Sequence, residues 1–193
     1  MTPPPAGPRR LILFNGPPGI GKSTIAQMYV DRHPGVLNLD IDLVRRLIGG
    51  WRERFSESGS LARTLALGMA GAHLRSGHDV LLPQYLGRLS EIERFEEVAL
   101  ASGASLCEIF LLDDMDGSIQ RFNRRGGGGP GWHREVRELV DRSGGDSLIS
   151  AMHDQLTEVL QRRPAAIIIA SQADRIEETY DAVIAALPDL PAD

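Results

Sequence analysis

A stretch near the N-terminus combines glycines, a lysine and two hydroxyl side chains at a spacing that suits phosphate groups. It matches the pattern G-x-x-x-x-G-K-[ST] and consists of Gly16, Pro17, Pro18, Gly19, Ile20, Gly21, Lys22, Ser23 and Thr24. Glycines let successive backbone N–H groups turn toward phosphate oxygens, and a helix N-terminus adds positive potential. In this motif the lysine reaches the β- and γ-phosphates and the first hydroxyl ligates Mg²⁺. We therefore predict an ATP site in which Lys22 binds phosphate and Ser23 binds Mg²⁺.

The elements around this loop are those that the motif requires. Leu11–Phe14 is a short apolar run typical of a buried strand, and residues from Thr24 to Val30 fit the opening turns of a helix. The order strand, glycine loop, helix makes the pattern specific. No Asn-Lys-x-Asp segment, which would recognise guanine, occurs in the chain, so ATP is expected rather than GTP.

Two carboxylates and an arginine follow the second predicted strand, residues 36–39. Asp40 and Asp42 stand two apart, so an extended backbone would place them on one face. If a helix begins at Asp42, that residue and Arg45 share a face at i, i+3 spacing. These residues could serve an active site, with Asp40 as a metal ligand or acceptor contact, but Asp42 could also be a helix N-cap.

The remaining pattern predicts an α/β fold of the P-loop NTPase type. Three further apolar runs, 80–82, 105–112 and 165–170, alternate with predicted helices. Strands with little polar alternation, separated by helices, indicate a five-stranded parallel sheet covered on both faces. The predicted helices after the first are 43–48, 61–74, 90–101, 116–125, 133–142, 146–162 and 175–187, with a loop or broken helix at 51–59. We expect a disordered leader over 1–9 and a single domain over 10–190.

Ligands of such folds bind outside the carboxyl ends of the strands. Gln84 and Tyr85 follow the third strand and are predicted to contact a phosphoryl acceptor, together with Trp51 and Phe55 in the preceding loop. Trp51 and Phe55, four apart, could equally be packing residues.

An arginine cluster in the second half of the chain is followed directly by a glycine run. Arg121, Arg124 and Arg125 precede six residues, Gly126–Gly131, that include five glycines. Such glycines could act as hinges for a lid that closes over the phosphates and excludes water. A solvated basic helix face is the alternative.

These motifs together resemble the small P-loop kinases that include polynucleotide 5′-hydroxyl kinases and chloramphenicol phosphotransferase. The resemblance rests on the phosphate loop and on Asp42-Leu43-Val44-Arg45, which matches the Asp-x-x-Arg of that group. It implies that Asp42 accepts the proton of the attacking hydroxyl and that Arg45 contacts the acceptor or a phosphate. It also implies a helical lid around 121–145, in which Arg121, Arg124 and Arg125 bind ATP and stabilise charge on the transferring group.

The sequence departs from that group at the third strand. Many relatives have an aspartate there that holds Mg²⁺ through water, whereas this chain has Leu82-Pro83-Gln84-Tyr85. Asp40 or Asp113 could replace it, or metal binding could be weaker. A non-acidic end at this strand is similar to the tunicamycin-resistance ATP-binding proteins.

These observations imply an ATP- and Mg²⁺-dependent kinase acting on a hydroxyl of an antibiotic-, nucleoside- or sugar-like molecule. Two alternatives stay open: a nucleotide or polynucleotide end kinase, and an ATP-dependent switch or sequestering resistance protein without phosphoryl transfer. The missing carboxylate keeps the last alternative open.

Composition limits the partners and the cellular location that the sequence allows. The 193 residues carry a net charge of −5 and one cysteine, which argues against long nucleic acid as a partner and excludes an internal disulfide. No apolar run approaches the ~20 residues of a membrane span, and the N-terminus lacks a signal-peptide pattern. A cytoplasmic location is expected.

Overall fold

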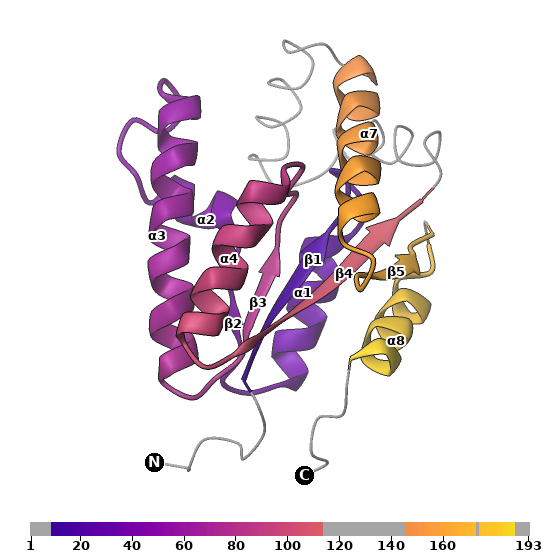
Figure 1. Ribbon diagram of the computed structural model, residues 1–193. Coiled ribbons are helices and arrows are strands. Elements are labelled where there is room, and N and C mark those ends of the chain that lie inside the picture. Colours follow the sequence, from indigo (N-terminus) through magenta and orange to yellow (C-terminus); the bar gives the residue numbers. More distant parts are fainter. Residues whose placement is uncertain (1–8, 114–145, 173, 188–193) are drawn as a thin grey trace.

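The computed structural model describes residues 9–113, 146–172 and 174–187. Its five strands form one sheet in which every pairing is parallel, in the order β2-β3-β1-β4-β5 (Figure 1). The strands are β1 (Arg10–Asn15), β2 (Leu37–Asn38), β3 (Val80–Pro83), β4 (Ser105–Leu112) and β5 (Ile167–Ala170). The helices are α1 (Lys22–Arg32), α2 (Ile41–Arg46), α3 (Phe55–Arg75), α4 (Leu89–Ala101), α7 (Asp146–Arg162) and α8 (Ile176–Ala186). The predicted α/β fold with a five-stranded parallel sheet is confirmed.

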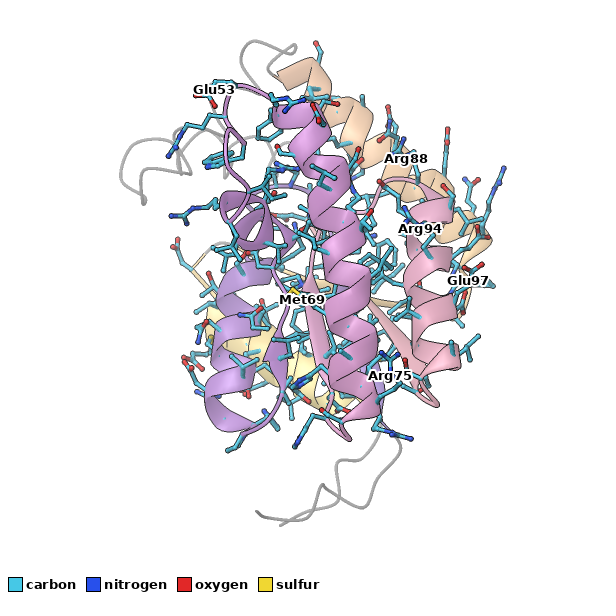
Figure 2. All side chains as sticks on the ribbon, turned by 90° about the vertical axis from the view of Figure 1, so that its left-hand side faces the viewer. Glu53, Met69, Arg75, Arg88, Arg94 and Glu97 are labelled. Carbon is cyan, nitrogen blue, oxygen red and sulfur yellow. The ribbon has the colours of Figure 1, made fainter. Side chains whose placement is uncertain are left out.

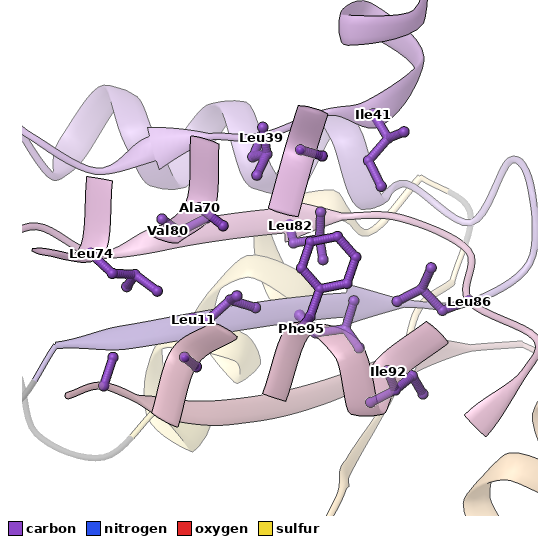
Figure 3. Packing of buried hydrophobic residues seen from close by; sticks show 14 of the residues in the cluster. Leu11, Leu39, Ile41, Ala70, Leu74, Val80, Leu82, Leu86, Ile92 and Phe95 are labelled. Atoms are coloured by element: carbon purple, nitrogen blue, oxygen red, sulfur yellow. The ribbon is translucent and has the colours of Figure 1, made fainter. Parts of the chain in front are cut away.

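Helices cover both faces of the sheet because successive residues of the buried strands point to opposite sides. In β1, Leu11 and Leu13 face a core shared with α2, α3, α4 and α7. Ile12 and Phe14 face a second core shared with α1 and α8. All four side chains are completely buried. Figure 3 shows the first core, where Phe95 of α4 lies over the sheet beside Leu82 and Leu86.

Helix α3 begins earlier than the sequence predicts. The expected start was residue 61, with a loop or broken helix over 51–59, but α3 runs from Phe55. Ser58 donates from its hydroxyl to the carbonyl oxygens of Trp51 and Phe55, at 3.1 and 3.0 Å, which stabilises the first turn. A Cβ on Gly59 would lie 2.8 Å from Nη2 of Arg45, so glycine here makes room for a packed arginine rather than breaking the helix.

The other boundaries shift by one or two residues. Helix α2 begins at Ile41 rather than residue 43, and β5 begins at Ile167 rather than residue 165. Helix α7 has the predicted bounds. Within the described ranges, no helix is both long and apolar enough to cross a membrane.

Candidate active site

The phosphate loop joins the end of β1 to the start of α1, as predicted. Gly16 has φ of +147°, and a Cβ on it would collide with the carbonyl oxygen of Leu111 in β4. Only glycine allows this close approach of two backbones. Lys22 is 9% exposed, and its Nζ donates to the carbonyl oxygens of Gly16 and Pro17 at 2.7 and 2.9 Å. The ammonium group is therefore held against the loop that would receive the phosphates.

Asn15, the last residue of β1, fixes the loop relative to β3. Its side-chain oxygen accepts from the backbone N–H of Gly16 at 2.9 Å and of Leu86 at 3.0 Å. Its amide nitrogen donates to the carbonyl oxygen of Leu86 at 2.9 Å. From the other side, the buried Ser171 hydroxyl donates to the carbonyl oxygen of Ile20 at 2.9 Å. Sequence reasoning missed Asn15; its only signal is a polar residue at the end of an apolar run.

Asp40 is the N-cap of α2. It has an extended backbone, and its Oδ1 accepts from the N–H of Asp42 at 2.9 Å. Burial raises the pKa of this carboxyl, and the charge of Asp42 adds to the effect, while the Lys22 ammonium opposes it. The end of β2 and the phosphate loop are thus brought close enough for their charges to interact. The alternative that Asp42 caps the helix is wrong, because Asp40 does so.

Asp42 lies in the first turn of α2 and pairs with Arg45, as the i, i+3 spacing predicted. Oδ1 of Asp42 is 3.2 Å from Nη1 of Arg45, and the two side chains are 33% and 11% exposed respectively. The guanidinium of Arg45 lies 4.1 Å from the centroid of the Phe55 ring. Burial lowers the pKa of Arg45, the carboxylate of Asp42 opposes this shift, and Arg63 reinforces it. A buried arginine therefore holds Asp42, while the carboxylate keeps access to solvent.

Trp51 and Phe55 lie together beside this pair. Their ring centroids are 6.5 Å apart, and both residues are half-buried. The guanidinium of Arg52 lies 4.5 Å from the centroid of the Trp51 ring. Phe55 is therefore a packing residue that contacts Arg45. The contact of Trp51 with an acceptor stays a prediction.

Gln84 and Tyr85 occupy the carboxyl end of β3, in place of the expected aspartate. The N–H of Gln84 donates to the carbonyl oxygen of Phe14 at 3.1 Å, and its Oε1 is buried without a hydrogen-bond partner among the described residues. The Tyr85 hydroxyl donates to Oε1 of Gln155 at 2.7 Å and to the carbonyl oxygen of Met152 at 3.2 Å, both in α7. Burial, with a further contribution from Glu91, raises the pKa of Tyr85 to about 12. Tyr85 thus attaches this loop to α7, and its contact with an acceptor stays a prediction.

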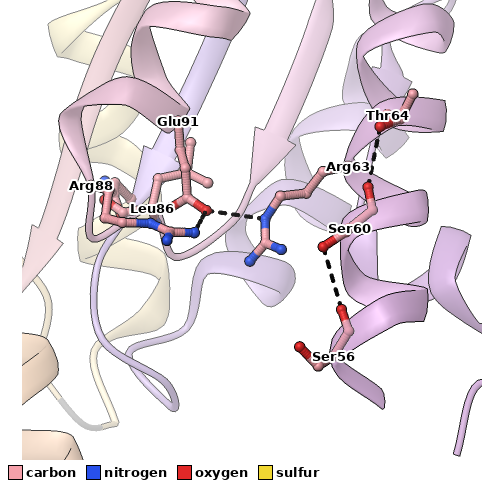
Figure 4. Close-up of polar contacts among 8 residues, drawn as sticks. Ser56, Ser60, Arg63, Thr64, Leu86, Arg88 and Glu91 are labelled. Carbon is pink, nitrogen blue, oxygen red and sulfur yellow. Dashed lines mark hydrogen bonds and ion pairs between the residues drawn. The ribbon is translucent and has the colours of Figure 1, made fainter. Parts of the chain in front are cut away.

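Glu91 joins the loop after β3 to α3. Its Oε1 lies 3.2 Å from Nε of Arg63 and 2.7 Å from Nη2 of Arg88 (Figure 4). The Arg63 pair joins α4 to α3, the helix whose first residues, Phe55 and Gly59, pack against Arg45 of α2. Sequence reasoning did not single out this pair, because its partners stand far apart in the chain.

The described residues bear on the predicted Mg²⁺ site but not on the predicted lid. No group of three or more His, Cys, Asp or Glu suited to a metal ion occurs within the described part of the chain. Mg²⁺ at a nucleotide is usually held by one or two side chains, phosphate oxygens and water, so Ser23 and Asp40 still fit such a site. Arg121, Arg124, Arg125 and the glycine run lie outside the described residues.

The fold and the phosphate loop define a P-loop NTPase with the architecture of the small P-loop kinases. The chain belongs to the AAA domain family, whose model matches residues 11–127. The predicted resemblance to small P-loop kinases is confirmed at this level.

Two solved structures illustrate the similarity. A gluconokinase from Sinorhizobium meliloti 1021 superimposes with a TM-score of 0.61 at 18% identity, covering 91% of this chain and 89% of that one. The tunicamycin resistance protein of Deinococcus radiodurans superimposes with a TM-score of 0.59 at 17% identity, covering 96% of this chain and 100% of that one. At these identities the likeness shows the shared fold. Comparison with curated protein sequences finds no match.

Proposed function

We propose that the protein is an ATP- and Mg²⁺-dependent kinase that transfers the γ-phosphoryl group to a hydroxyl of a small molecule. The observation that carries this proposal is the separation of roles between Asp40 and Asp42. Asp40 caps α2 and interacts with Lys22, which leaves the carboxylate of Asp42 partly exposed and oriented by Arg45. A carboxylate that is positioned but not consumed by capping is what a hydroxyl acceptor needs.

The proposed reaction uses these groups in sequence. Lys22 leaves the loop carbonyl oxygens and binds phosphate oxygens of ATP. Asp42 orients the acceptor hydroxyl and takes its proton as the oxygen attacks the γ-phosphorus, and ADP leaves with the bridging oxygen. Mg²⁺, held by Ser23 and Asp40, would neutralise phosphate charge. In the single domain proposed over 10–190, Arg121, Arg124 and Arg125 of a lid around 121–145 would neutralise the transferring group.

The acceptor would lie on the side of Arg45, Trp51 and Gln84. Gln84 supports this placement because its buried Oε1 has no protein partner among the described residues at the strand end where acceptors bind. An antibiotic-, nucleoside- or sugar-like cytoplasmic compound would suit one aromatic ring and a few polar groups. The gluconokinase and tunicamycin resistance neighbours are compatible with such acceptors.

A second candidate is an ATP-dependent switch or sequestering protein. The absence of a carboxylate at the end of β3 favours it, because Mg²⁺ would then be held less firmly for chemistry.

One experiment separates the two. The protein is incubated with ATP, Mg²⁺ and a panel of hydroxylated compounds, and products are analysed by mass spectrometry with ADP release measured in parallel. A kinase gives a product heavier by one phosphoryl group in amounts that match ADP. Tight acceptor binding that depends on ATP, without any phosphorylated product, would support sequestration instead.

A further inference from the structure

A continuous line of hydrogen bonds joins the phosphate loop to the loop that follows β3, residues 84–88. Lys22 donates from Nζ to the carbonyl oxygen of Gly16. The N–H of the same glycine donates to Oδ1 of Asn15, which also accepts from the N–H of Leu86. The amide nitrogen of Asn15 donates back to the carbonyl oxygen of Leu86. One side chain therefore connects the predicted ATP loop to the loop where the acceptor is predicted to bind.

The place that Asn15 occupies requires an acceptor and a donor on one short side chain. Asn15 is completely buried, where polar groups without partners are costly. Its carbonyl oxygen faces two N–H groups and its NH₂ group faces a carbonyl oxygen. An ionised aspartate would instead turn a negative charge toward that carbonyl oxygen. The pairing of β1 with β3 ends at Phe14 and Pro83, so the Asn15 side chain continues the connection beyond the sheet.

The 84–88 loop is attached differently at its other residues. Tyr85 binds α7 through its hydroxyl group. Arg88 is exposed at the start of α4, on the side of the molecule that Figure 2 turns to the viewer. Between them, both main-chain polar groups of Leu86 bind Asn15. The main chain in the middle of this loop is therefore placed by a residue that also holds the phosphate loop.

We propose that Asn15 is a positioning residue that transmits occupation of the phosphate loop to the 84–88 loop, so that ATP and the acceptor bind cooperatively. The inference rests on the proposed function, because it takes these two loops as the sites of ATP and of the acceptor. Phosphate oxygens replace the carbonyl oxygen of Gly16 as a partner of Lys22 and fix the phosphate loop. Asn15 then holds Leu86 in one position, so ordering the loop costs a second ligand less. An acceptor would tighten ATP binding by the same factor.

The test is hydrogen–deuterium exchange of the 84–88 backbone amides in the full chain. Exchange is compared with and without Mg²⁺ and adenylyl imidodiphosphate, a non-hydrolysable ATP analogue, at a concentration that calorimetry shows to be saturating. We expect the analogue to slow wild-type exchange by about 10-fold, within the range of typical couplings between two sites. Asn15→Ala removes the side-chain hydrogen bonds and should abolish this response. Asn15→Asp keeps the acceptor for both N–H groups but loses the donor to Leu86, and should abolish it too.

Ser171→Ala is the matched control. The Ser171 hydroxyl holds the phosphate loop at Ile20, from the side of β5, so its loss loosens that loop while Asn15 stays in place. The response of the 84–88 loop should therefore persist at saturation. If Ser171→Ala loses the response as fully as Asn15→Ala, general loosening explains both and the proposal is wrong. A wild-type chain whose exchange the analogue does not slow also overturns it, and this measurement needs no variant. So does an Asn15→Ala chain that keeps the response.

The coupling and the proposed function fail separately. Slower exchange that depends on Asn15, without any phosphorylated product from the panel of hydroxylated compounds, supports the coupling and rejects the kinase. A phosphorylated product without slower exchange rejects the coupling alone. A chain that does not bind the analogue rejects both.

Discussion

Replacing Asp42 by Asn tests the proposed base without disturbing the helix cap. Asp40 supplies the cap of α2 through its 2.9 Å bond to the N–H of residue 42, and that backbone group survives the substitution. Asn has nearly the size of Asp, and its carbonyl oxygen can still accept from Nη1 of Arg45. What disappears is the negative charge that would take the acceptor proton.

The substitution is expected to lower stability slightly and the rate of phosphoryl transfer strongly. The Asp42–Arg45 pair is 3.2 Å long and partly exposed on the Asp42 side, so its loss falls at the upper end of surface pairs, about 1 kcal/mol. That lowers the melting temperature by about 2–4 °C for a chain of this size. A positioned base is worth ~10²–10⁴ in rate, or about 3–5 kcal/mol of barrier. Transfer should therefore fall far more than stability.

Asp40→Asn is the matched control, since Asn caps a helix about as well as Asp. If Asp40 helps to bind Mg²⁺, raising the Mg²⁺ concentration should restore part of the activity of Asp40→Asn. The same change should not restore the activity of Asp42→Asn. The assay follows phosphorylated acceptor and ADP at saturating ATP, with melting curves for both variants. If Asp42→Asn transfers the phosphoryl group at the wild-type rate, the reasoning is refuted and another residue must act as the base.

Other predictions address the loop, the core and the lid. Lys22→Ala should keep the fold and weaken ATP binding by about 10–10²-fold, measured by calorimetry, because a charge-assisted contact to phosphate is lost. Arg163→Met strands the buried carboxylate of Glu108 and should cost about 3 kcal/mol in chemical unfolding, with partial recovery on adding Glu108→Gln. The pKa of Asp40 is raised above its ordinary value of 3.8, so the folded state holds this proton longer and stability falls as pH rises through that range. Asp40→Asn should therefore be more stable than wild type at neutral pH and no more stable near pH 3 in thermal scans. Arg124→Ala should lower kcat more than it raises the KM for ATP, because lid arginines pair with charge that peaks in the transition state; a change confined to KM would contradict this.

The parts that sequence predicted well are those set by local pattern. The glycine loop needs its residue types at fixed spacing, and the strands are short apolar runs whose burial on both faces leaves little ambiguity. The i, i+3 pair of Asp42 and Arg45 is also local, since any helix places the two side chains on one side.

The wrong or missed predictions concern features that depend on contacts between residues far apart in the sequence. Asp40 and Asp42 can both cap a helix, and the extended backbone at the end of β2 gives the cap to Asp40. The start of α3 depends on Arg45 packing over Phe55 and beside Gly59, which no window of the sequence around residue 59 contains. The same holds for Asn15, because two of its three side-chain hydrogen bonds reach Leu86 in the loop after β3.

Helix α7 connects the stability of the core to the geometry of the candidate site. Next to its C-terminal end, Arg163 donates from Nε to Glu108 of β4 at 2.7 Å and from Nη1 and Nη2 to Glu96 of α4, both at 2.9 Å. At its middle, Gln155 accepts from the Tyr85 hydroxyl at the end of β3. A helix held at these two points has little freedom to shift along the sheet, and burial of Leu156 and Val159 fixes its rotation. Through α7 the packing of the core thus fixes the position of Tyr85, and with it the end of β3 beside which the acceptor is proposed to bind.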